Sequence, residues 1–115
     1  MRLLVQKVNK ASVLVSNKIV GKINKGLLVF QGVDLNDTED DIDWVVKKII
    51  NLRIFKDENK IMNLSVREVD GDILVVSQFT LMASVKKGNR PSYINAAHKN
   101  HAELFYNKFT ERLSD

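Results

Sequence analysis

The chain has 115 residues, 44% hydrophobic and 28% charged, with a net charge of +4 and a pI near 9.4, as in one ordinary globular domain. No apolar run approaches the ~18–20 residues that cross a bilayer, and no charged-then-apolar leader opens the sequence. It contains no cysteine, which excludes disulfides and thiolate metal sites, so we expect one domain over residues 1–115 in a reducing cytoplasm.

The first third of the chain predicts four strands. Short segments rich in Val, Ile and Leu occupy residues 2–8, 11–15, 19–23 and 27–33, and turn-forming pairs separate them. We expect an antiparallel meander whose fourth, nearly all-apolar strand is buried on both faces. Residues 1–33 also carry six Lys or Arg and no acid. This charge either attracts a polyanion such as RNA or belongs to solvated strand faces.

Six acidic residues between positions 34 and 43 mark a helix start. Asp37 or Thr38 can cap the helix, and carboxylates in its first turn favour the positive end of the dipole. Apolar residues then recur at helical spacing: Ile42, Val45, Val46, Ile49 and Leu52. A helix start explains these acids better than a metal or catalytic carboxylate cluster, and Trp44 is interpreted as a packing residue.

A hairpin and a second helix are predicted in the rest of the chain. Asp70-Gly71 is typical of a type I′ turn, which folds residues 64–69 back on residues 72–80. A basic loop at residues 85–92 holds the only proline. In the final helix, Asn100 is the expected cap, and its apolar stripe contains Ala102, Phe105, Tyr106, Phe109 and Leu113. The fold class is therefore α/β, with mixed, mainly antiparallel, barrel-like sheets packed against two main helices.

Polar residues interrupt the apolar strand that follows the predicted hairpin turn. Strand alternation sends Ser77, Phe79 and Leu81 to one face, and Gln78, Thr80 and Met82 to the other. Their hydroxyl and amide groups can converge on a polar ligand, and free backbone N–H groups can stabilise an oxyanion. Alternatively, these side chains satisfy neighbouring backbone groups. The basic residues Lys86, Lys87 and Arg90 follow closely and are placed to meet phosphates.

Several other kinds of site find little support. No Gly-rich loop has the spacing of a nucleotide-binding motif, and a Ser-His-acid triad needs a tertiary placement that the sequence does not show. His98 and His101 are the only histidines, and no third ligand accompanies them, so we expect exposed residues at a helix start. No metal and no cofactor are predicted.

The chain resembles the D-aminoacyl-tRNA deacylase (D-tyrosyl-tRNA deacylase) family. The resemblance covers nearly the whole chain, and its most specific part is the Ser-Gln-Phe-Thr block. The matching segments, in family order, are Gln6-Lys7-Val8, Ala11-Ser12-Val13, Gly26-Leu-Leu-Val29, Asn51-Leu-Arg-Ile-Phe55, Met62-Asn-Leu64, Leu74-Val-Val-Ser-Gln-Phe-Thr-Leu81 and Lys87-Gly88-x-Arg90-Pro-Ser92.

The resemblance implies a homodimeric, metal-independent hydrolase that edits mischarged tRNA by cleaving the ester bond of D-aminoacyl-tRNA, or of glycyl-tRNA mischarged on tRNA-Ala. Thr80, Gln78 and Phe79 match the catalytic block. Ser77, Lys7, Met82, Lys87 and Arg90 are the expected substrate-binding residues. A threonine without a nearby base is a poor nucleophile, so we expect the ribose 2′-OH of the tRNA to drive the chemistry while Thr80 positions the substrate. A tight backbone pocket would exclude the L side chain sterically.

Two departures from the family pattern bear on this expectation. Lys7 and Lys10 stand where the family usually has Arg, and Lys lacks the planar fork needed for bidentate contacts. The family also ordinarily continues into a strand-rich segment whose Gly-Pro motif reaches the partner subunit's site, and residues 1–115 contain no such motif. The alternatives are a catalytically incomplete fragment that binds tRNA ends without turnover, and an RNA-binding module unrelated to editing.

Overall fold

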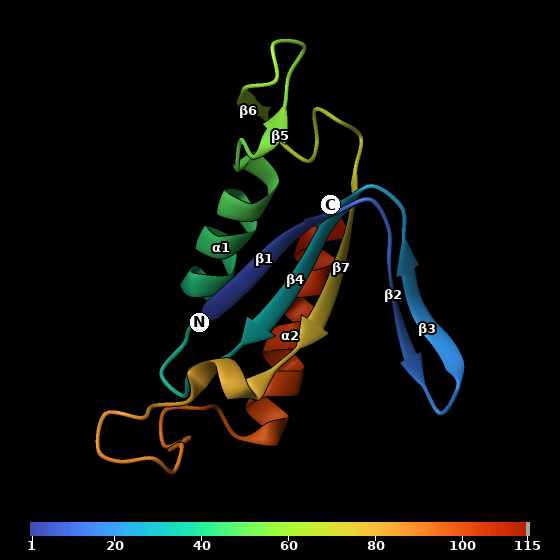
Figure 1. Ribbon diagram of the computed structural model, residues 1–115. Coiled ribbons are helices and arrows are strands. Elements are labelled where there is room, and N and C mark those ends of the chain that lie inside the picture. The colour runs from blue at the N-terminus through green and yellow to red at the C-terminus, as the bar shows by residue number, and fades with distance from the viewer. Residues whose placement is uncertain (115) are drawn as a thin grey trace.

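The computed structural model describes residues 1–114, and these form seven strands, two α-helices and one short 3₁₀ helix, η1 (Figure 1). The mixed α/β class with two main helices is confirmed. Asp115, where the second helix was expected to end, lies outside the described residues.

A three-stranded sheet forms the centre of the molecule. Strand β4 (Gly26–Gly32) lies between β1 (Arg2–Val8), which is antiparallel to it, and β7 (Asp72–Ser77), which is parallel to it. The register pairs Gln31 with Ser77 and Gly32 with Arg2, so the end of β7, the end of β4 and the start of β1 lie at one end of the sheet.

The predicted meander is wrong because β4, the most apolar strand, takes the centre of the sheet and pairs with β1 and β7. Strands β2 (Ala11–Val15) and β3 (Lys18–Ile23) form a hairpin of their own that projects from the sheet (Figure 1). Ser16 and Asn17, both at positive φ, make its two-residue turn.

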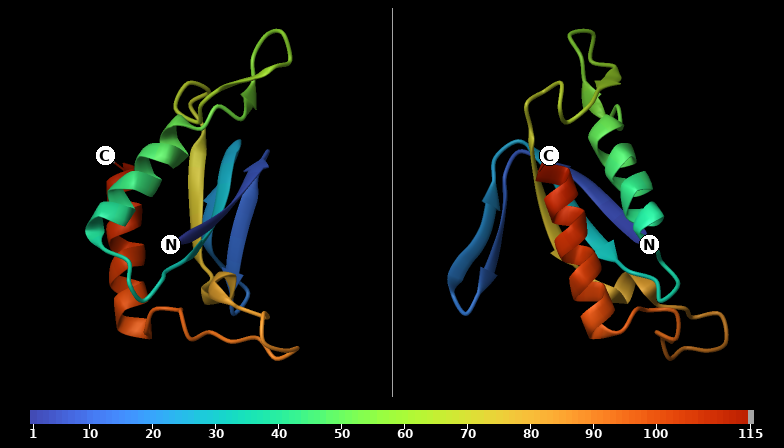
Figure 2. Two further views of the ribbon diagram at one scale, coloured as in Figure 1. Left: turned by 90° about the vertical axis from the view of Figure 1, so that its left-hand side faces the viewer. Right: turned by 180° about the vertical axis from the view of Figure 1, so that it is seen from behind.

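Both helices cover the same face of the central sheet (Figure 2). The core between these layers combines side chains of β4 with those of both helices and the segments beside them: Leu27, Val29, Val33, Ile42, Val45, Ile49, Phe55, Val66, Phe105 and Phe109. The expectation that β4 is buried on both faces is only half correct. Leu28 and Phe30, which point away from the helices, are only partly buried.

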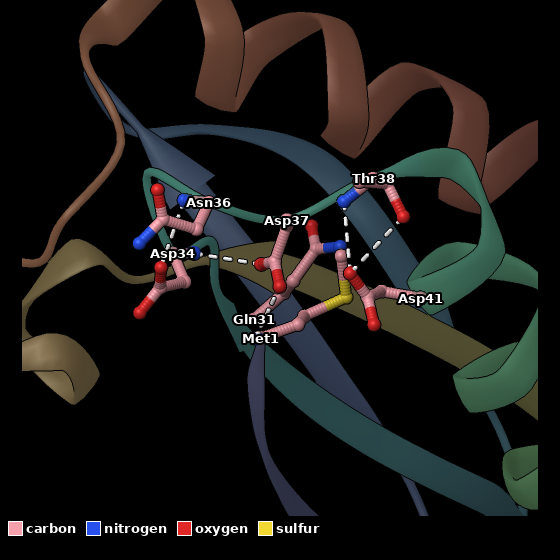
Figure 3. Close-up of polar contacts among 7 residues, drawn as sticks. All are labelled: Met1, Gln31, Asp34, Asn36, Asp37, Thr38 and Asp41. Carbon is pink, nitrogen blue, oxygen red and sulfur yellow. Dashed lines mark hydrogen bonds and ion pairs between the residues drawn. The ribbon is translucent and has the colours of Figure 1, made fainter.

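The acidic segment begins α1 (Glu39–Asn51), as predicted. Thr38 is the N-cap of a capping box, in which its backbone N–H donates to Asp41 Oδ2 at 2.8 Å (Figure 3). The prediction for Trp44 is wrong: its side chain is 62% exposed, with the Lys48 ammonium over its ring. Amphipathic spacing places Trp44 on the solvent side of a helix whose inner face Ile42, Val45 and Ile49 already fill.

Helix α2 (Lys99–Ser114) begins one residue before the expected cap and is joined to α1 by ion pairs. Arg112 contacts Glu39 at 2.7 Å and Asp43 at 3.0 Å, and Lys108 contacts Glu39 at 3.0 Å. The hydrogen bond from Lys108, followed by that from Arg112, lowers the pKa of the Glu39 carboxyl. Within the described residues, neither helix is long and apolar enough to cross a membrane.

The expected hairpin across Asp70-Gly71 is wrong. Strand β6 (Met62–Leu64) pairs with β5 (Phe55–Lys56), and residues 65–71 make a helical-type turn. Ser65 N–H donates to the Glu68 carboxylate, and Glu68 N–H donates back to Ser65 Oγ. Asp70 has a positive φ and Gly71 does not, which rules out the two positive φ angles of a type I′ turn.

Candidate functional site

The polar block follows the end of β7 and turns away from the sheet. The predicted strand to Thr80 is wrong: β7 ends at Ser77, and residues 79–82 form η1 (Phe79–Met82). Gln78 N–H donates to the Gln31 carbonyl at 2.7 Å, which is the last link to β4, and Leu81 N–H then bonds to the Gln78 carbonyl. The two-face alternation expected for residues 77–82 therefore stops at Ser77.

Neighbouring strands hold η1 in place. Arg2 Nη1 donates to the Leu81 carbonyl at 2.9 Å. Gly32 leaves the room that η1 needs, because a Cβ at this position would lie 3.0 Å from Leu81 Cβ and 3.2 Å from the Gln78 oxygen. The polar block thus rests directly on the ends of β1 and β4.

A hollow of about 390 Å³ opens between β7, η1 and the start of α2. Ser77 and Phe79 line one side, and α2 with the residues before it supplies the rest: Ala97, Lys99, Ala102, Glu103 and Tyr106. The walls are mainly apolar, and they also carry the hydroxyls of Ser77 and Tyr106 and the opposite charges of Lys99 and Glu103. This combination suits a small organic group that carries polar ends.

Thr80 and Gln78 contact each other beside this hollow. Gln78 Nε2 donates to Thr80 Oγ1, and both side chains are at least partly accessible. Among the described residues, no histidine or carboxylate hydrogen-bonds to the Thr80 hydroxyl, and Gln78 is the side chain that engages it. The backbone N–H groups of Phe79 and Thr80 also have no partner among these residues. The arrangement orients a hydroxyl and offers N–H donors, and it supplies Thr80 with no base.

A second, basic hollow of about 320 Å³ lies in the loop after η1. Lys86, Lys87 and Arg90 line it together with Ser84, Ser92, Ile94 and Asn95. Phe79, which lines the first hollow, packs edge-on against Tyr93 with ring centroids 5.1 Å apart. The chain neighbours of Tyr93, Ser92 and Ile94, line the basic hollow together with Lys87 and Arg90.

Two of the predicted substrate-binding residues lie elsewhere. Lys7 pairs with Leu27, which in turn pairs with Ile73 at the start of β7, so Lys7 lies about 13 Å along the sheet from Ser77. Its ammonium donates to the Ile54 carbonyl at 3.3 Å. Met82 is 5% exposed and packs with its Cγ toward Gly32. Neither side chain lines the hollow beside Phe79.

The two histidines do not form a metal site with other residues. Within residues 1–114, no group of three His, Cys, Asp or Glu side chains gathers in a way that could hold an ion. His98 is exposed, as predicted, whereas His101 is partly buried and stacks on Phe105 at 4.2 Å between centroids.

Tyr106 and Tyr93 belong to this region although the sequence did not single them out for it. Tyr106 OH donates to the Val75 carbonyl at 3.0 Å, which ties α2 to β7 and fixes one wall of the hollow. A tyrosine in an otherwise apolar helical stripe was the available signal, since a buried hydroxyl needs a partner. Tyr93 lies in a loop without periodicity, and no pattern pointed to it.

Comparison with known proteins gives consistent results over nearly the whole chain. The family model described as D-Tyr-tRNA(Tyr) deacylase matches residues 4–115. The chain belongs to this family. The D-aminoacyl-tRNA deacylases of Flavobacterium johnsoniae and Flavobacterium psychrophilum are 56% and 52% identical to it over 113 residues, which is 98% of this chain and 75% of each relative.

Solved structures share the fold of this chain. A structure described as c-Myc DNA Unwinding Element Binding Protein superposes with a TM-score of 0.93 and is 43% identical, over 98% of this chain and 76% of that one. A structure described as a probable eukaryotic D-amino acid tRNA deacylase has a TM-score of 0.81, and its 23% identity supports the fold alone. In this deacylase-family chain, Ser77 and Phe79 line the first hollow, and Phe79 packs on Tyr93.

Proposed function

We propose that this chain hydrolyses the ester bond of D-aminoacyl-tRNA and releases the free D-amino acid and the tRNA. Family membership over residues 4–115 is the observation that carries the proposal. The Ser77–Thr80 block supports it, because Phe79 lines a mainly apolar hollow and packs on Tyr93, whose chain neighbours Ser92 and Ile94 line a basic hollow. The 3′ end of an aminoacyl-tRNA carries both an organic group and phosphates, which match these two surfaces.

In this proposal, Lys87 and Arg90 bind the phosphates near the 3′ end, and Ser77 and Phe79 contact the aminoacyl-adenosine. Thr80, held by Gln78, positions the ester. The ribose 2′-OH directs a water molecule to the carbonyl carbon, the bond from that carbon to the ribose 3′ oxygen breaks, and the 3′ oxygen takes up a proton from the water. The backbone N–H groups of Phe79 and Thr80 donate to the developing oxyanion. Such a mechanism needs no base beside Thr80.

We also propose a cytoplasmic homodimer. The dimer is supported by large apolar side chains that are exposed on β1 and on the β2–β3 hairpin: Leu4, Leu14, Val15, Ile19 and Val20. Sedimentation equilibrium measures the mass directly, and a monomer at micromolar concentration would contradict the proposal.

The decisive experiment is the release of amino acid from D-tyrosyl-, L-tyrosyl- and glycyl-tRNA by the purified chain. We expect rapid release from the D-ester and little from the L-ester. If neither the D-amino acid nor glycine is released faster than in buffer, the proposal fails. Tight binding of the same tRNA without turnover would identify a binding protein.

A further inference from the structure

A hollow of about 300 Å³ lies at the end of the central sheet where β1 ends and β4 begins. The side chains that line this lysine hollow are Lys7, Val8, Asn9, Lys25, Phe55 and Lys56. Strand β7 ends with Ser77 at the opposite end of the sheet (Figure 1). The lysine hollow is therefore separate from the proposed ester site.

The ammonium groups of the lysine hollow have no carboxylate partner among residues 1–114. None of the ion pairs in this part of the chain includes Lys7, Lys25 or Lys56. The Lys7 ammonium donates to the neutral Ile54 carbonyl at 3.3 Å, and the Lys25 ammonium lies 5.9 Å from the centroid of the Phe55 ring. The positive charge of the hollow is thus not neutralised by these contacts.

The acids beside these lysines are engaged by N–H donors instead. The Asp57 carboxylate, next to Lys56 in the chain, accepts two backbone N–H groups of its own turn through Oδ1. The Asp72 carboxylate accepts the N–H of Asn24, which precedes Lys25, at 3.4 Å. Because neither carboxylate forms an ion pair with a lysine, both leave the hollow positively charged.

Two further lysines extend the positive surface to the base of the β2–β3 hairpin. A hollow of about 430 Å³ is lined there by Lys10, Ala11, Ser12, Ile19, Lys22 and Ile23. Of the basic residues within positions 1–33, the ones that line these two hollows are Lys7, Lys10, Lys22 and Lys25. The charge that opens the sequence is therefore gathered at one end of the sheet rather than spread over the strand faces.

We propose that the lysine hollow binds phosphates of the paired acceptor stem of tRNA while the Ser77–Thr80 block holds the unpaired 3′ end. The identity of this RNA rests on the proposed function. Lysines that share one hollow repel each other, and phosphate oxygens between them replace this repulsion with attraction. Duplex RNA is contacted mainly through its phosphates and 2′-hydroxyls, which suits ammonium groups that carry no planar fork for reading bases.

The spacing of the two surfaces suits one tRNA. Lys7 lies about 13 Å along the sheet from Ser77. The 3′ end of a tRNA has about four unpaired nucleotides, which extend over about 14 Å when they stack at about 3.4 Å each. When the terminal ester lies at the Ser77–Thr80 block, the stem therefore begins at the distance of the lysine hollow. A small anion could occupy only one of these surfaces.

The first experiment measures, by fluorescence anisotropy, the binding of a labelled RNA hairpin that has the acceptor stem and no unpaired 3′ end. For Lys25→Gln with Lys56→Gln, we expect Kd to rise at least about fivefold at low salt. The slope of log K against log salt should be shallower by about 0.9 for each duplex phosphate that is no longer neutralised. Lys7 is retained because it also holds the Ile54 carbonyl.

The matched control is Lys47→Gln with Lys48→Gln, which removes the same charge from the exposed side of α1. We expect it to leave Kd and the slope nearly unchanged. All four substituted lysines are exposed, so both double variants should melt close to the parent chain. Equal effects of the two double variants on hairpin binding would overturn the proposal.

A second comparison separates the two ends of the sheet. Lys87→Gln with Arg90→Gln should weaken the binding of full tRNA, carrying no amino acid, more than that of the hairpin. Lys25→Gln with Lys56→Gln should weaken both. If the latter variant affects only RNA that has the unpaired 3′ end, the lysine hollow does not bind the stem and the proposal is wrong.

Phosphatidylserine vesicles test a membrane surface as the other source of phosphates. Vesicle binding that needs Lys25 and Lys56, together with an unchanged Kd for RNA, would replace this proposal by a membrane contact. None of these measurements uses turnover. Normal hydrolysis of D-tyrosyl-tRNA with hairpin binding that does not need Lys25 and Lys56 would contradict this inference alone. Hairpin binding that needs both lysines, without hydrolysis, would contradict only the proposed function.

Discussion

At the scale of single residues, the Thr80 hydroxyl decides between two kinds of ester hydrolysis. A threonine that attacks needs a base to remove its proton, and among the described residues Thr80 has Gln78 as its side-chain partner instead. An amide can orient a hydroxyl but cannot accept a proton at neutral pH. This contact supports our proposal that Thr80 positions the ester.

We predict that Thr80→Ala lowers kcat about tenfold and leaves folding and tRNA binding intact, since it removes one orienting hydrogen bond. The measurement is single-turnover release from D-tyrosyl-tRNA. Thr80→Ser restores the hydroxyl and serves as the matched control, with nearly full activity expected. A decrease of more than about a thousandfold in a folded, tRNA-binding Thr80→Ala chain would instead identify Thr80 as the nucleophile.

At the scale of elements, the end of β4 acts as the support for η1. Gln31 accepts the last ladder bond from Gln78, and Gly32 has no side chain at the place where Leu81 and Met82 approach. Two of the nearest atoms, Leu81 Cβ and the Gln78 backbone oxygen, move only with the backbone, so rotating a flexible side chain cannot make full room for a methyl group at Gly32.

Gly32→Ala is expected to lower stability by about 1–3 kcal/mol through overpacking and to lower kcat more than about tenfold by displacing η1. Gly71→Ala is the matched control: its added Cβ would also meet a neighbour at 3.0 Å, Val66 Cγ2, at the other end of β7. We expect Gly71→Ala to lower the free energy of unfolding and to leave kcat unchanged. Chemical denaturation and single-turnover kinetics separate the two effects, and an equal decrease of kcat in both variants would show that η1 does not depend on β4.

The elements that the sequence revealed are those whose signals are local. The acids around Thr38 predicted the start of α1, and apolar segments separated by turn-forming pairs predicted β1 and β2, because caps, composition and turns depend on neighbouring residues. The parallel pairing of β4 with β7 joins segments far apart in the chain, and no local pattern encodes it. Asp70-Gly71 misled for a different reason, because another local signal precedes it: Ser65 N–H donates to the Glu68 carboxylate and Glu68 N–H donates to Ser65 Oγ, which turns the chain before a hairpin can form.

The candidate site shows the same division. Ser77, Gln78 and Thr80 drew attention because polar side chains interrupt a buried strand, and the structure places them where that strand ends. Lys7 was assigned to the same site by resemblance, and the antiparallel register of β1 places it at the opposite end of the sheet. Residue type alone could not show that Lys7 lies far from Ser77, because that depends on how distant segments of the chain pair in the sheet.

At the scale of the whole molecule, positive charge gathers in the loop that follows η1. Lys86, Lys87 and Arg90 line one hollow, and within residues 1–114 none of them forms an ion pair with a carboxylate. Their charges are available to an external polyanion, and binding to phosphates releases counterions. The affinity for tRNA should then fall steeply with salt.

The salt dependence tests this surface quantitatively. For Lys87→Gln with Arg90→Gln, we predict weaker tRNA binding at low salt and a slope of log K against log salt that is shallower by about 0.7 for each single-strand phosphate that the variant no longer neutralises. Lys47→Gln with Lys60→Gln removes the same charge from exposed positions in α1 and the β5–β6 turn, and it should leave the slope nearly unchanged. Fluorescence anisotropy with labelled tRNA that carries no amino acid gives both slopes without requiring turnover. If the two double variants shift the slope equally, the net charge of the chain, rather than the basic hollow, governs tRNA binding.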